Sequence, residues 1–327
     1  MMESTQIPLL VIGGPTGSGK TDFAMKLAEH YPIEVLSADS RQVYRQMDIG
    51  TAKVTSQEQD RVKHHLIDVV DPDEDFSVAD FTRLAHVAVS DIVRRNKIPV
   101  VVGGTGLYVR ALTQGLLDGP AENSELRSTL LKDEKQQAGI LHRRLMDVDF
   151  FLAQTLHPKD LTRIVRGLEV YVATGVPLSQ LQRQHGFKEQ PYQLLNFAVS
   201  VPRPVLYERI NRRVELMIEA GLLQEVQQLL ANGYSPNLKS MRTIGYRQCV
   251  AHLRDGLSLD DVISGIQQDS RRYAKRQMTW LRRDDSIIWV DYNKEFGSIL
   301  EWIDKFYVTA QHLSSWVLIT LISCNFI

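Results

Sequence analysis

Residues 14–21 read Gly14-Pro15-Thr16-Gly17-Ser18-Gly19-Lys20-Thr21 and follow the continuous apolar run PLLVIGG at residues 8–14. They match the P-loop pattern GxxxxGK[ST]. The segment TDFAMKLAEHY that follows places Phe23, Leu27 and Ala28 at helical spacing. A glycine-rich turn between a buried strand and a helix is the context that this motif requires. The stretch therefore predicts a phosphate-binding loop that opens an α/β domain.

The residue types in this loop indicate how it would hold phosphate. Its glycines allow backbone N–H groups to converge on phosphate oxygens, and the following helix presents its positive N-terminal end. Lys20 would neutralise phosphate charge, and Thr21 is the expected ligand of a Mg²⁺ cofactor. We therefore predict that all eight residues from Gly14 to Thr21 form the phosphate site.

The motif alone does not identify the phosphate compound. Most chains that carry it are nucleotide-binding kinases or ATPases. A later strand at Ile98–Val102 runs into Gly103-Gly104-Thr105, where an ATPase would typically offer an acidic residue for Mg²⁺. This difference argues against a motor-type ATPase.

Further apolar runs define the fold class. Strands are expected at IEVLSAD (33–39), at 98–102 and at LLNFAVSV (194–201), and residues 75–97 carry apolar side chains at helical spacing. Continuous apolar strands that alternate with amphipathic helices predict a P-loop NTPase-like α/β fold, with a parallel sheet covered by helices on both faces.

The chain changes character in its middle third. Residues 118–195 contain charged helical segments without strong strand signals, at 124–137, 140–149 and 160–175. We interpret them as a helical insertion between a first core segment, 1–117, and a second, 196–307. One long helical stretch is expected at 204–230, ended by Asn232-Gly233.

Composition and charge restrict the functional classes. The chain of 327 residues is 43% hydrophobic and 24% charged, which is typical of a globular protein. A net charge of −1 does not by itself indicate a nucleic-acid partner. Charge is uneven, however, because the segment RRYAKRQMTWLRR at 271–283 holds six basic residues and no acidic one.

Cysteine use and the two ends of the chain bear on localisation. Cys249 and Cys324 are isolated, so neither a disulfide framework nor a zinc site is expected, and a reducing cytoplasm is favoured. Residues 1–8 are short and polar, unlike a secretory leader. The segment Leu313–Ile327 is apolar but about five residues short of the roughly 20 that span a bilayer. A packed or frayed end is favoured over a membrane tether, and no membrane partner is expected.

Asp39 is the first candidate catalytic residue. It ends the strand expected at 33–39, just past the edge where open α/β sheets bind their ligands. A carboxylate there can accept a proton from an incoming nucleophile. A helix N-cap or an outer Mg²⁺ ligand are the alternatives at this position.

Six sequence blocks in order resemble the bacterial tRNA dimethylallyltransferases. They are GPTGSGKT (14–21), SADSRQVYRQMDIGTAK (37–53), HHLIDVVDP (64–72), DFSVADF (75–81), GGTGLYVRAL (103–112) and RTIGYRQ (242–248). The resemblance extends from about residue 8 to residue 305 and leaves the hydrophobic tail, 308–327, outside it.

This resemblance implies a reaction. A dimethylallyl group would move from dimethylallyl diphosphate to N6 of the adenosine 3′-adjacent to the anticodon in tRNA, with release of diphosphate. The P-loop would hold diphosphate, with Mg²⁺ on Thr21, and Asp39 would be the general base. Thr105 is the second implied catalytic residue. Arg209 matches a diphosphate contact, although an exposed helix face is the alternative for it.

The resemblance also implies residues that contact tRNA. They are Asp39, Ser40, Arg41, Gln42, Thr105, Arg127, Thr162, Arg163, Ile164, Val165, Arg166, Arg242, Thr243, Ile244, Gly245, Tyr246 and Arg247. The basic segment 271–283 fits RNA phosphates, with stacking from Tyr273 or Trp280. Equally, Tyr273, Met278 and Leu281 could face the core while the basic side chains stay in water.

Three other functions compete with this prediction. A prenyltransferase acting on free AMP or ATP shares the P-loop and the aspartate, but it does not explain the helical insertion or the basic segment. A P-loop nucleotide kinase should bind ATP and need no RNA. A noncatalytic RNA-binding protein could retain the fold. We expect a monomeric cytoplasmic enzyme with tRNA and dimethylallyl diphosphate as substrates.

Overall fold

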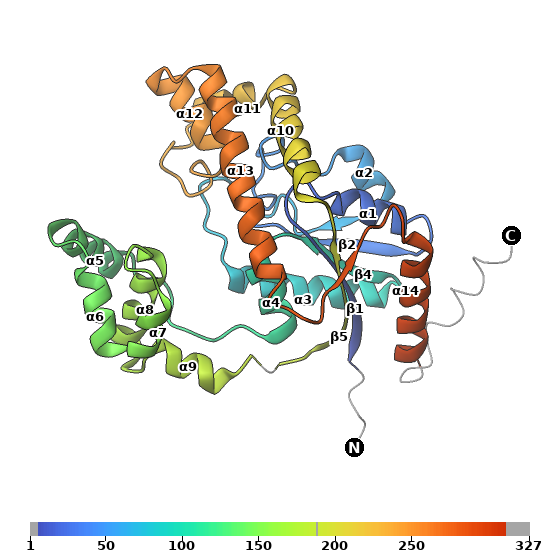
Figure 1. Ribbon diagram of the computed structural model, residues 1–327, viewed down its shortest axis with the longest axis horizontal. Helices are drawn as coiled ribbons and strands as arrows, with labels where there is room; N and C mark the ends of the chain where they lie inside the picture. Colours follow the sequence, from blue (N-terminus) through green and yellow to red (C-terminus); the bar gives the residue numbers. More distant parts are fainter. Residues whose placement is uncertain (1–5, 188, 312–327) are drawn as a thin grey trace, which may run out of the picture. The chain divides into compact units, whose positions relative to one another are not determined.

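The computed structural model describes residues 6–187 and 189–311, and its larger compact unit is built around a parallel sheet (Figure 1). The described strands lie in the order β3-β2-β4-β1-β5-β6, and every neighbouring pair is parallel. The strands are β1 (Ile7–Gly13), β2 (Ile33–Ala38), β3 (His64–His65), β4 (Ile98–Gly103), β5 (Tyr192–Val199) and β6 (Ile288–Val290). The predicted α/β class with a parallel sheet is confirmed.

Helices cover both faces of the sheet, as predicted. One hydrophobic layer contains α1 (Lys20–Leu27) and α14 (Phe296–Gln311), and the other contains α3 (Val78–Arg94) and α4 (Gly106–Gln114). Successive strand residues point to opposite faces. In β1, Leu10 and Ile12 therefore pack on the α1 side, whereas Leu9 and Val11 pack on the α3 side. This double coverage explains why β1 is apolar along its whole length.

The capping box of α3 accounts for its first turn. The Ser77 hydroxyl accepts a hydrogen bond from the backbone N–H of Asp80, and the Asp80 carboxylate accepts one from the backbone N–H of Ser77. Two helix-terminal N–H groups are thereby satisfied. The buried face that follows, from Phe81 to Ile92, holds the helix on the sheet.

A second group of helices follows β5 in the same compact unit. It comprises α10 (Arg203–Glu219), α11 (Leu222–Ala231), α12 (Tyr246–Asp255) and α13 (Leu259–Leu281). The prediction of one helix over 204–230 is wrong, because Gly221 adopts the left-handed conformation with φ 101° and separates α10 from α11. The break lets Leu222 and Val226 pack against Val43 in the loop after β2. A short helix, α2 (Ser56–Arg61), lies further along that loop.

Residues 114–189 form a compact helical unit of their own. Its helices are α5 (Ser124–Gln136), α6 (Ile140–Val148), α7 (Phe150–Thr155), α8 (Leu161–Thr174) and α9 (Leu178–His185), around a core that includes Leu141, Leu145 and Ile164. The predicted insertion boundary at residue 195 is too late. Residues 192–195 belong to β5, where Tyr192 pairs with Ile7 of β1. The strand was predicted at 194–201, and the structure begins it two residues earlier, at Tyr192 and Gln193.

The predicted boundary after residue 307 falls inside a helix. Helix α14 continues to Gln311, so residues 308–311 are helical. The remaining part of the predicted tail, 312–327, lies outside the described residues. Within the described ranges, no helix is both long and apolar enough to cross a membrane.

Glu169 organises the ion pairs of the helical unit. Its carboxylate is 1% exposed and accepts hydrogen bonds from the Arg127 and Arg166 guanidinium groups and from the backbone N–H of Asn123. Burial alone would raise the pKa of this carboxyl, but the hydrogen bonds, led by that of Arg127, outweigh it and lower the pKa to about 2. Arg127 and Arg166, which are both predicted to contact tRNA, thus also hold this unit together.

We expect Glu169→Gln to destabilise residues 114–189 by about 3 kcal/mol, because it leaves two guanidinium groups without their buried counter-charge. Hydrogen exchange of the amides in α5 and α8 should accelerate. Since the folded pKa of about 2 lies below the ordinary value of 4.5, this contribution is complete above pH 4.5 and disappears as the pH falls toward 2. Glu122→Gln, at a carboxylate that is 60% exposed, is the matched control. Equal protection in the Glu169 and Glu122 variants would contradict the prediction.

Candidate active site

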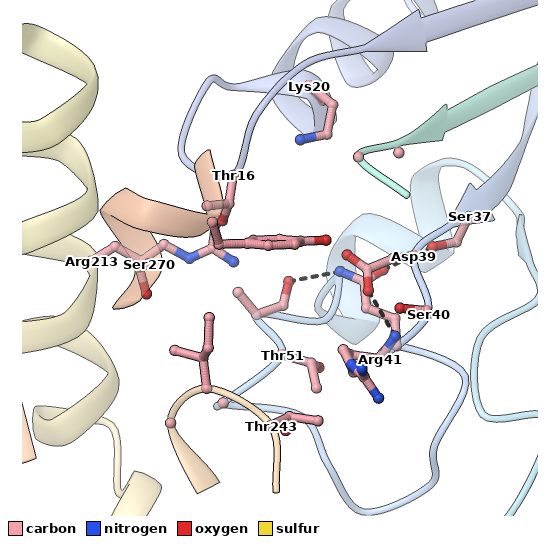
Figure 2. Close-up of a pocket in the computed structure, with 18 of the residues that line it drawn as sticks. Thr16, Lys20, Ser37, Asp39, Ser40, Arg41, Thr51, Arg213, Thr243 and Ser270 are labelled. Carbon is pink, nitrogen blue, oxygen red and sulfur yellow. Dashed lines mark hydrogen bonds between the residues drawn. The ribbon is translucent and has the colours of Figure 1, made fainter. Parts of the chain in front are cut away.

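A cavity of about 430 Å³ lies at the carboxyl edge of the sheet (Figure 2). It collects the P-loop, the residues after β2, the turn after β4 and side chains of α10 and α13. In Figure 2, Arg213 and Ser270 lie across the cavity from Asp39, Ser40 and Arg41, and Lys20 of the P-loop lies above them. A second cavity of about 410 Å³ shares five lining residues with the first, among them the polar residues Lys20, Thr21 and Arg213. These three residues therefore stand where the two cavities meet.

The P-loop adopts its curved form through glycines with positive φ. Gly17 and Gly19 have φ of 79° and 92°, which other residues rarely adopt. Gly19 precedes the first residue of α1, so the positive end of that helix faces the loop. The Ser18 hydroxyl is fully buried and has no hydrogen-bond partner within the described chain. The predicted strand, loop and helix are thus present.

Lys20 is desolvated in this loop. Its Nζ donates a hydrogen bond to the carbonyl of Pro15 at 2.9 Å. Burial lowers the pKa of Lys20 to about 8; Asp39 acts in the opposite direction, and the Arg213 charge lowers the pKa further. Burial also lowers the pKa of Arg213. Two desolvated cations that line the same cavity favour a bound anion, and a diphosphate would meet that requirement.

Asp39 lies on the wall of the larger cavity, directly after β2. Its Oδ1 accepts a hydrogen bond from the backbone N–H of Arg41 at 2.8 Å, which fixes the turn. No described helix begins here, since α2 starts at Ser56, so the N-cap alternative is excluded. A general base and an outer Mg²⁺ ligand both remain compatible with this position.

Thr105 does not line the cavity, but its side chain contacts the turn that carries Asp39. Its hydroxyl accepts a hydrogen bond from the backbone N–H of Ser40 at 3.2 Å. Tyr273 of α13 lies near Thr105 and lines the cavity. The predicted pair Asp39 and Thr105 is therefore brought together, with Thr105 holding the turn that carries Asp39.

Arg213 is a site residue that the sequence did not reveal. It extends from α10, lines both cavities, and donates from Nη1 to the Thr16 hydroxyl at 3.4 Å. The predicted Arg209 lies one helical turn earlier and lines only the smaller cavity, together with Gly17 and Gly19. The four-residue spacing of the two arginines on one helix was the available signal.

Several predicted tRNA contacts line the larger cavity. Arg41, Gln42 and the loop residues Arg242, Thr243, Ile244, Gly245 and Arg247 line it. The Gln42 amide is already used, since it accepts from the Ser37 hydroxyl and donates to the carbonyl of Ala52. Thr162 and Arg163, in the separate helical unit, are exposed.

Three predicted tRNA contacts require correction because their side chains are buried. Tyr246 is 0% exposed, and its hydroxyl donates to Glu225 at 2.6 Å. Ile164 and Val165 belong to the hydrophobic core of the helical unit. These three side chains stabilise the fold and do not reach a ligand at the surface.

The basic segment 271–283 lies at the C-terminal end of α13. Ala274, Gln277 and Leu281 are buried, whereas Arg272 and Lys275 are exposed. Tyr273 faces the cavity rather than the hydrophobic core. The helix thus presents one face to the site and a basic face to solvent.

The residues around the P-loop suit one kind of Mg²⁺ site. Thr21 lines both cavities, and the described residues contain no cluster of three His, Cys, Asp or Glu side chains that could form a protein-only metal cage. Mg²⁺ typically takes one or two protein ligands and completes its shell with phosphate oxygens and water. The Thr21 hydroxyl beside a diphosphate fits that pattern.

Comparisons with known proteins identify the family. The family model described as IPP transferase matches residues 42–284, and the model described as isopentenyl transferase matches residues 7–71. A tRNA dimethylallyltransferase of Syntrophotalea carbinolica is 53% identical over 93% of this chain and 97% of its own length. That of Geobacter metallireducens is 49% identical over 94% and 100%.

Solved structures show the same relationship. The full-length tRNA isopentenylpyrophosphate transferase of Bacillus halodurans is 38% identical, with a TM-score of 0.70 over 94% of this chain and 99% of that one. A eukaryotic dimethylallyltransferase acting on tRNA is 26% identical, with a TM-score of 0.79 over 95% and 85%. The resemblance found in the sequence is confirmed, and the chain belongs to the IPP transferase family.

Proposed function

We propose that this protein transfers a dimethylallyl group from dimethylallyl diphosphate to N6 of the adenosine 3′-adjacent to the anticodon in tRNA. The observation that carries the proposal is the convergence of Lys20, Thr21 and Arg213 with Asp39 on one cavity. Relatives that match almost the whole chain are named for this activity. The enzyme would act as a monomer in the cytoplasm.

The diphosphate half of the prenyl donor would occupy the P-loop. Backbone N–H groups of the loop, Lys20 and Arg213 would neutralise charge that accumulates on the diphosphate oxygens as the allylic C–O bond breaks. Thr21 would hold Mg²⁺, which when bound adds positive charge at the same oxygens. Because Lys20 and Arg213 are desolvated, their attraction for this charge is stronger than it would be in water.

Asp39 would act on the acceptor. As N6 of the adenosine bonds to the allylic carbon, the C–O bond to diphosphate breaks and the N6 proton passes to the Asp39 carboxylate. An exocyclic amine conjugated to a purine is a weak nucleophile, so removal of this proton has to accompany attack. The hydrogen bond from Arg41 N–H fixes the carboxylate for that role.

A macromolecular acceptor explains the arginines of the larger cavity better than free AMP does. Arg41, Arg242, Arg247 and Arg276 all line the larger cavity, and α13 adds exposed basic residues. Phosphates along an RNA loop would neutralise such a series of cations. Extrusion of the target adenosine from the loop would deliver N6 to Asp39.

The decisive experiment follows radiolabelled dimethylallyl from its diphosphate onto unmodified tRNA in the presence of Mg²⁺, with AMP as the competing acceptor. Label in tRNA and none in AMP supports the proposal. Label in AMP instead would assign the protein to the prenyltransferases of free nucleotides. No labelled product together with tight ATP binding would identify a nucleotide-binding P-loop protein.

Exchange of the two α10 arginines should separate their roles. We expect Arg213→Gln to lower kcat/KM for dimethylallyl diphosphate by about 100-fold, as removal of a preorganised transition-state contact does. Arg209→Gln, at the smaller cavity only, should lower it by less than about 10-fold, as for a partly exposed contact. Steady-state kinetics at saturating tRNA measure both values. The reverse order would assign the principal diphosphate contact to Arg209.

A further inference from the structure

The Gln277 side chain links two turns that carry opposite halves of the candidate active site. Its Oε1 accepts a hydrogen bond from the backbone N–H of Thr16 at 2.9 Å, and its Nε2 donates to the carbonyl of Gly104 at 2.9 Å. Thr16 belongs to the P-loop. Gly104 directly precedes Thr105, whose hydroxyl holds the Ser40 N–H beside Asp39. Gln277, which is 8% exposed, therefore links the P-loop to the turn after β4, and Thr105 in that turn holds the backbone beside Asp39.

The contact between Gln277 and Gly104 restricts the position of both residues. Gly104 has no Cβ, and a Cβ at that position would collide with the Gln277 amide nitrogen. Tyr273 lies one helical turn before Gln277, lines the larger cavity and lies near Thr105. The same face of α13 thus touches the P-loop and the turn after β4.

From this geometry we infer that Gln277 is a positioning residue, which sets the separation between the bound diphosphate and the acceptor amine. The inference rests on the proposed transfer reaction. Displacement requires the attacking nitrogen and the allylic carbon to lie about 3–3.5 Å apart, and a misplacement of about 1 Å lowers the rate by roughly 100-fold. Gln277 lines the same cavity as Asp39, but both polar atoms of its amide are bonded to Thr16 and Gly104, so it would act through those two residues.

Gln277→Met tests this role because methionine has a similar length and makes neither hydrogen bond. We expect kcat for tRNA prenylation to fall by about 30-fold, while KM for each substrate changes by less than about 3-fold. Misaligned prenyl donor should also react with water, whose oxygen bonds to the allylic carbon as diphosphate leaves. The ratio of diphosphate released to tRNA labelled should therefore rise clearly above one.

Two further variants complete the experiment. Gln267→Met changes another glutamine of α13, which donates only to the carbonyl of Asn211 at 3.4 Å, and should retain wild-type kcat and a ratio near one. Gln277→Glu keeps the acceptor for Thr16 N–H but sets a carboxylate oxygen against the Gly104 carbonyl. Its added negative charge beside the P-loop should weaken diphosphate binding, but kcat should also fall at saturating dimethylallyl diphosphate. This loss of kcat provides a second test if Gln277→Met does not fold.

The outcomes separate this inference from the proposed function. A wild-type protein that labels tRNA, combined with unchanged kcat and unchanged product ratio in both Gln277 variants, overturns the inference alone. A loss confined to the KM of dimethylallyl diphosphate also overturns it, because Gln277 would then only shape the P-loop. A wild-type protein that labels no tRNA overturns the proposed function and the inference together.

Discussion

Asp39→Asn is expected to lower kcat for tRNA prenylation by about 1,000-fold, within the range that positioned general bases contribute. The asparagine carbonyl oxygen can still accept the hydrogen bond from Arg41 N–H that Oδ1 accepts in the native turn. The turn and the cavity wall should therefore persist, while the amide can no longer take the N6 proton. Single-turnover transfer of labelled dimethylallyl to tRNA measures the chemical step directly.

Two controls make this result specific to the base. Asp60→Asn removes the same charge from an exposed residue of α2 and should retain wild-type kcat. Diphosphate binding, measured by calorimetry, should be no weaker in Asp39→Asn than in the native protein, because a negative charge near Lys20 is lost. A rate within about 10-fold of wild type would leave Asp39 as an outer Mg²⁺ ligand or a structural residue rather than the base.

The parts of this site that could be predicted from sequence are local in the chain. Residues 14–21 form a loop whose conformation depends on its own glycines and on the strand and helix beside it. Asp39 was predictable because every parallel strand ends at the same edge of the sheet, so its position in space follows from its position after β2. Neither inference required knowledge of the rest of the chain.

The residues that were missed depend on contacts between distant segments. Gln277 meets Thr16 across 261 positions of sequence, and Arg213 meets it across 197. Helical periodicity assigns each of them to a helix face, but it does not indicate what that face contacts. The contacts of each face depend on how α10 and α13 are oriented on the sheet. This orientation depends on the packing of Leu206, Ile210 and Ala274.

The motifs also did not determine which of their side chains are buried. The RTIGYRQ block contains Arg247 at the cavity and the adjacent Tyr246, which is buried against Glu225. The carboxylate of Glu225 also accepts the backbone N–H groups of Asp48, Ile49 and Gly50. Tyr246 thus helps to hold the loop that carries Thr51 at the cavity wall. A motif that includes both kinds of residue does not distinguish a ligand contact from a support.

Replacement of Lys20 should have opposite effects on activity and stability. Lys20→Met is expected to lower kcat/KM for dimethylallyl diphosphate by about 1,000-fold, because a desolvated cation at the leaving group is lost. The same change should stabilise the ligand-free protein. A pKa lowered from 10.5 to about 8 means that charged Lys20 destabilises the folded state by about 3 kcal/mol at pH 7.

The pH dependence of unfolding gives the sign of this effect. Because the folded pKa of about 8 lies below the unfolded value of 10.5, the unfolded state binds more protons between these values. The contribution of Lys20 to the free energy of unfolding is therefore least favourable below pH 8 and improves as the pH rises toward 10.5. In Lys20→Met this rise should be absent.

Urea unfolding of the native protein, Lys20→Met and Lys97→Met from pH 7 to pH 10 would test both consequences. Lys97 is exposed and directly precedes β4, at the opposite edge of the sheet from the cavity, so it controls for the loss of one charge. We expect Lys20→Met to be more stable than the native protein by about 1–3 kcal/mol at pH 7, since loss of the hydrogen bond to Pro15 offsets part of the gain. Equal stability at every pH, or a loss of stability at pH 7, would show that Lys20 is not held at an energetic cost. A gain at pH 7 that vanishes toward pH 10, together with lost transfer, would show that the P-loop is organised for a diphosphate before one binds.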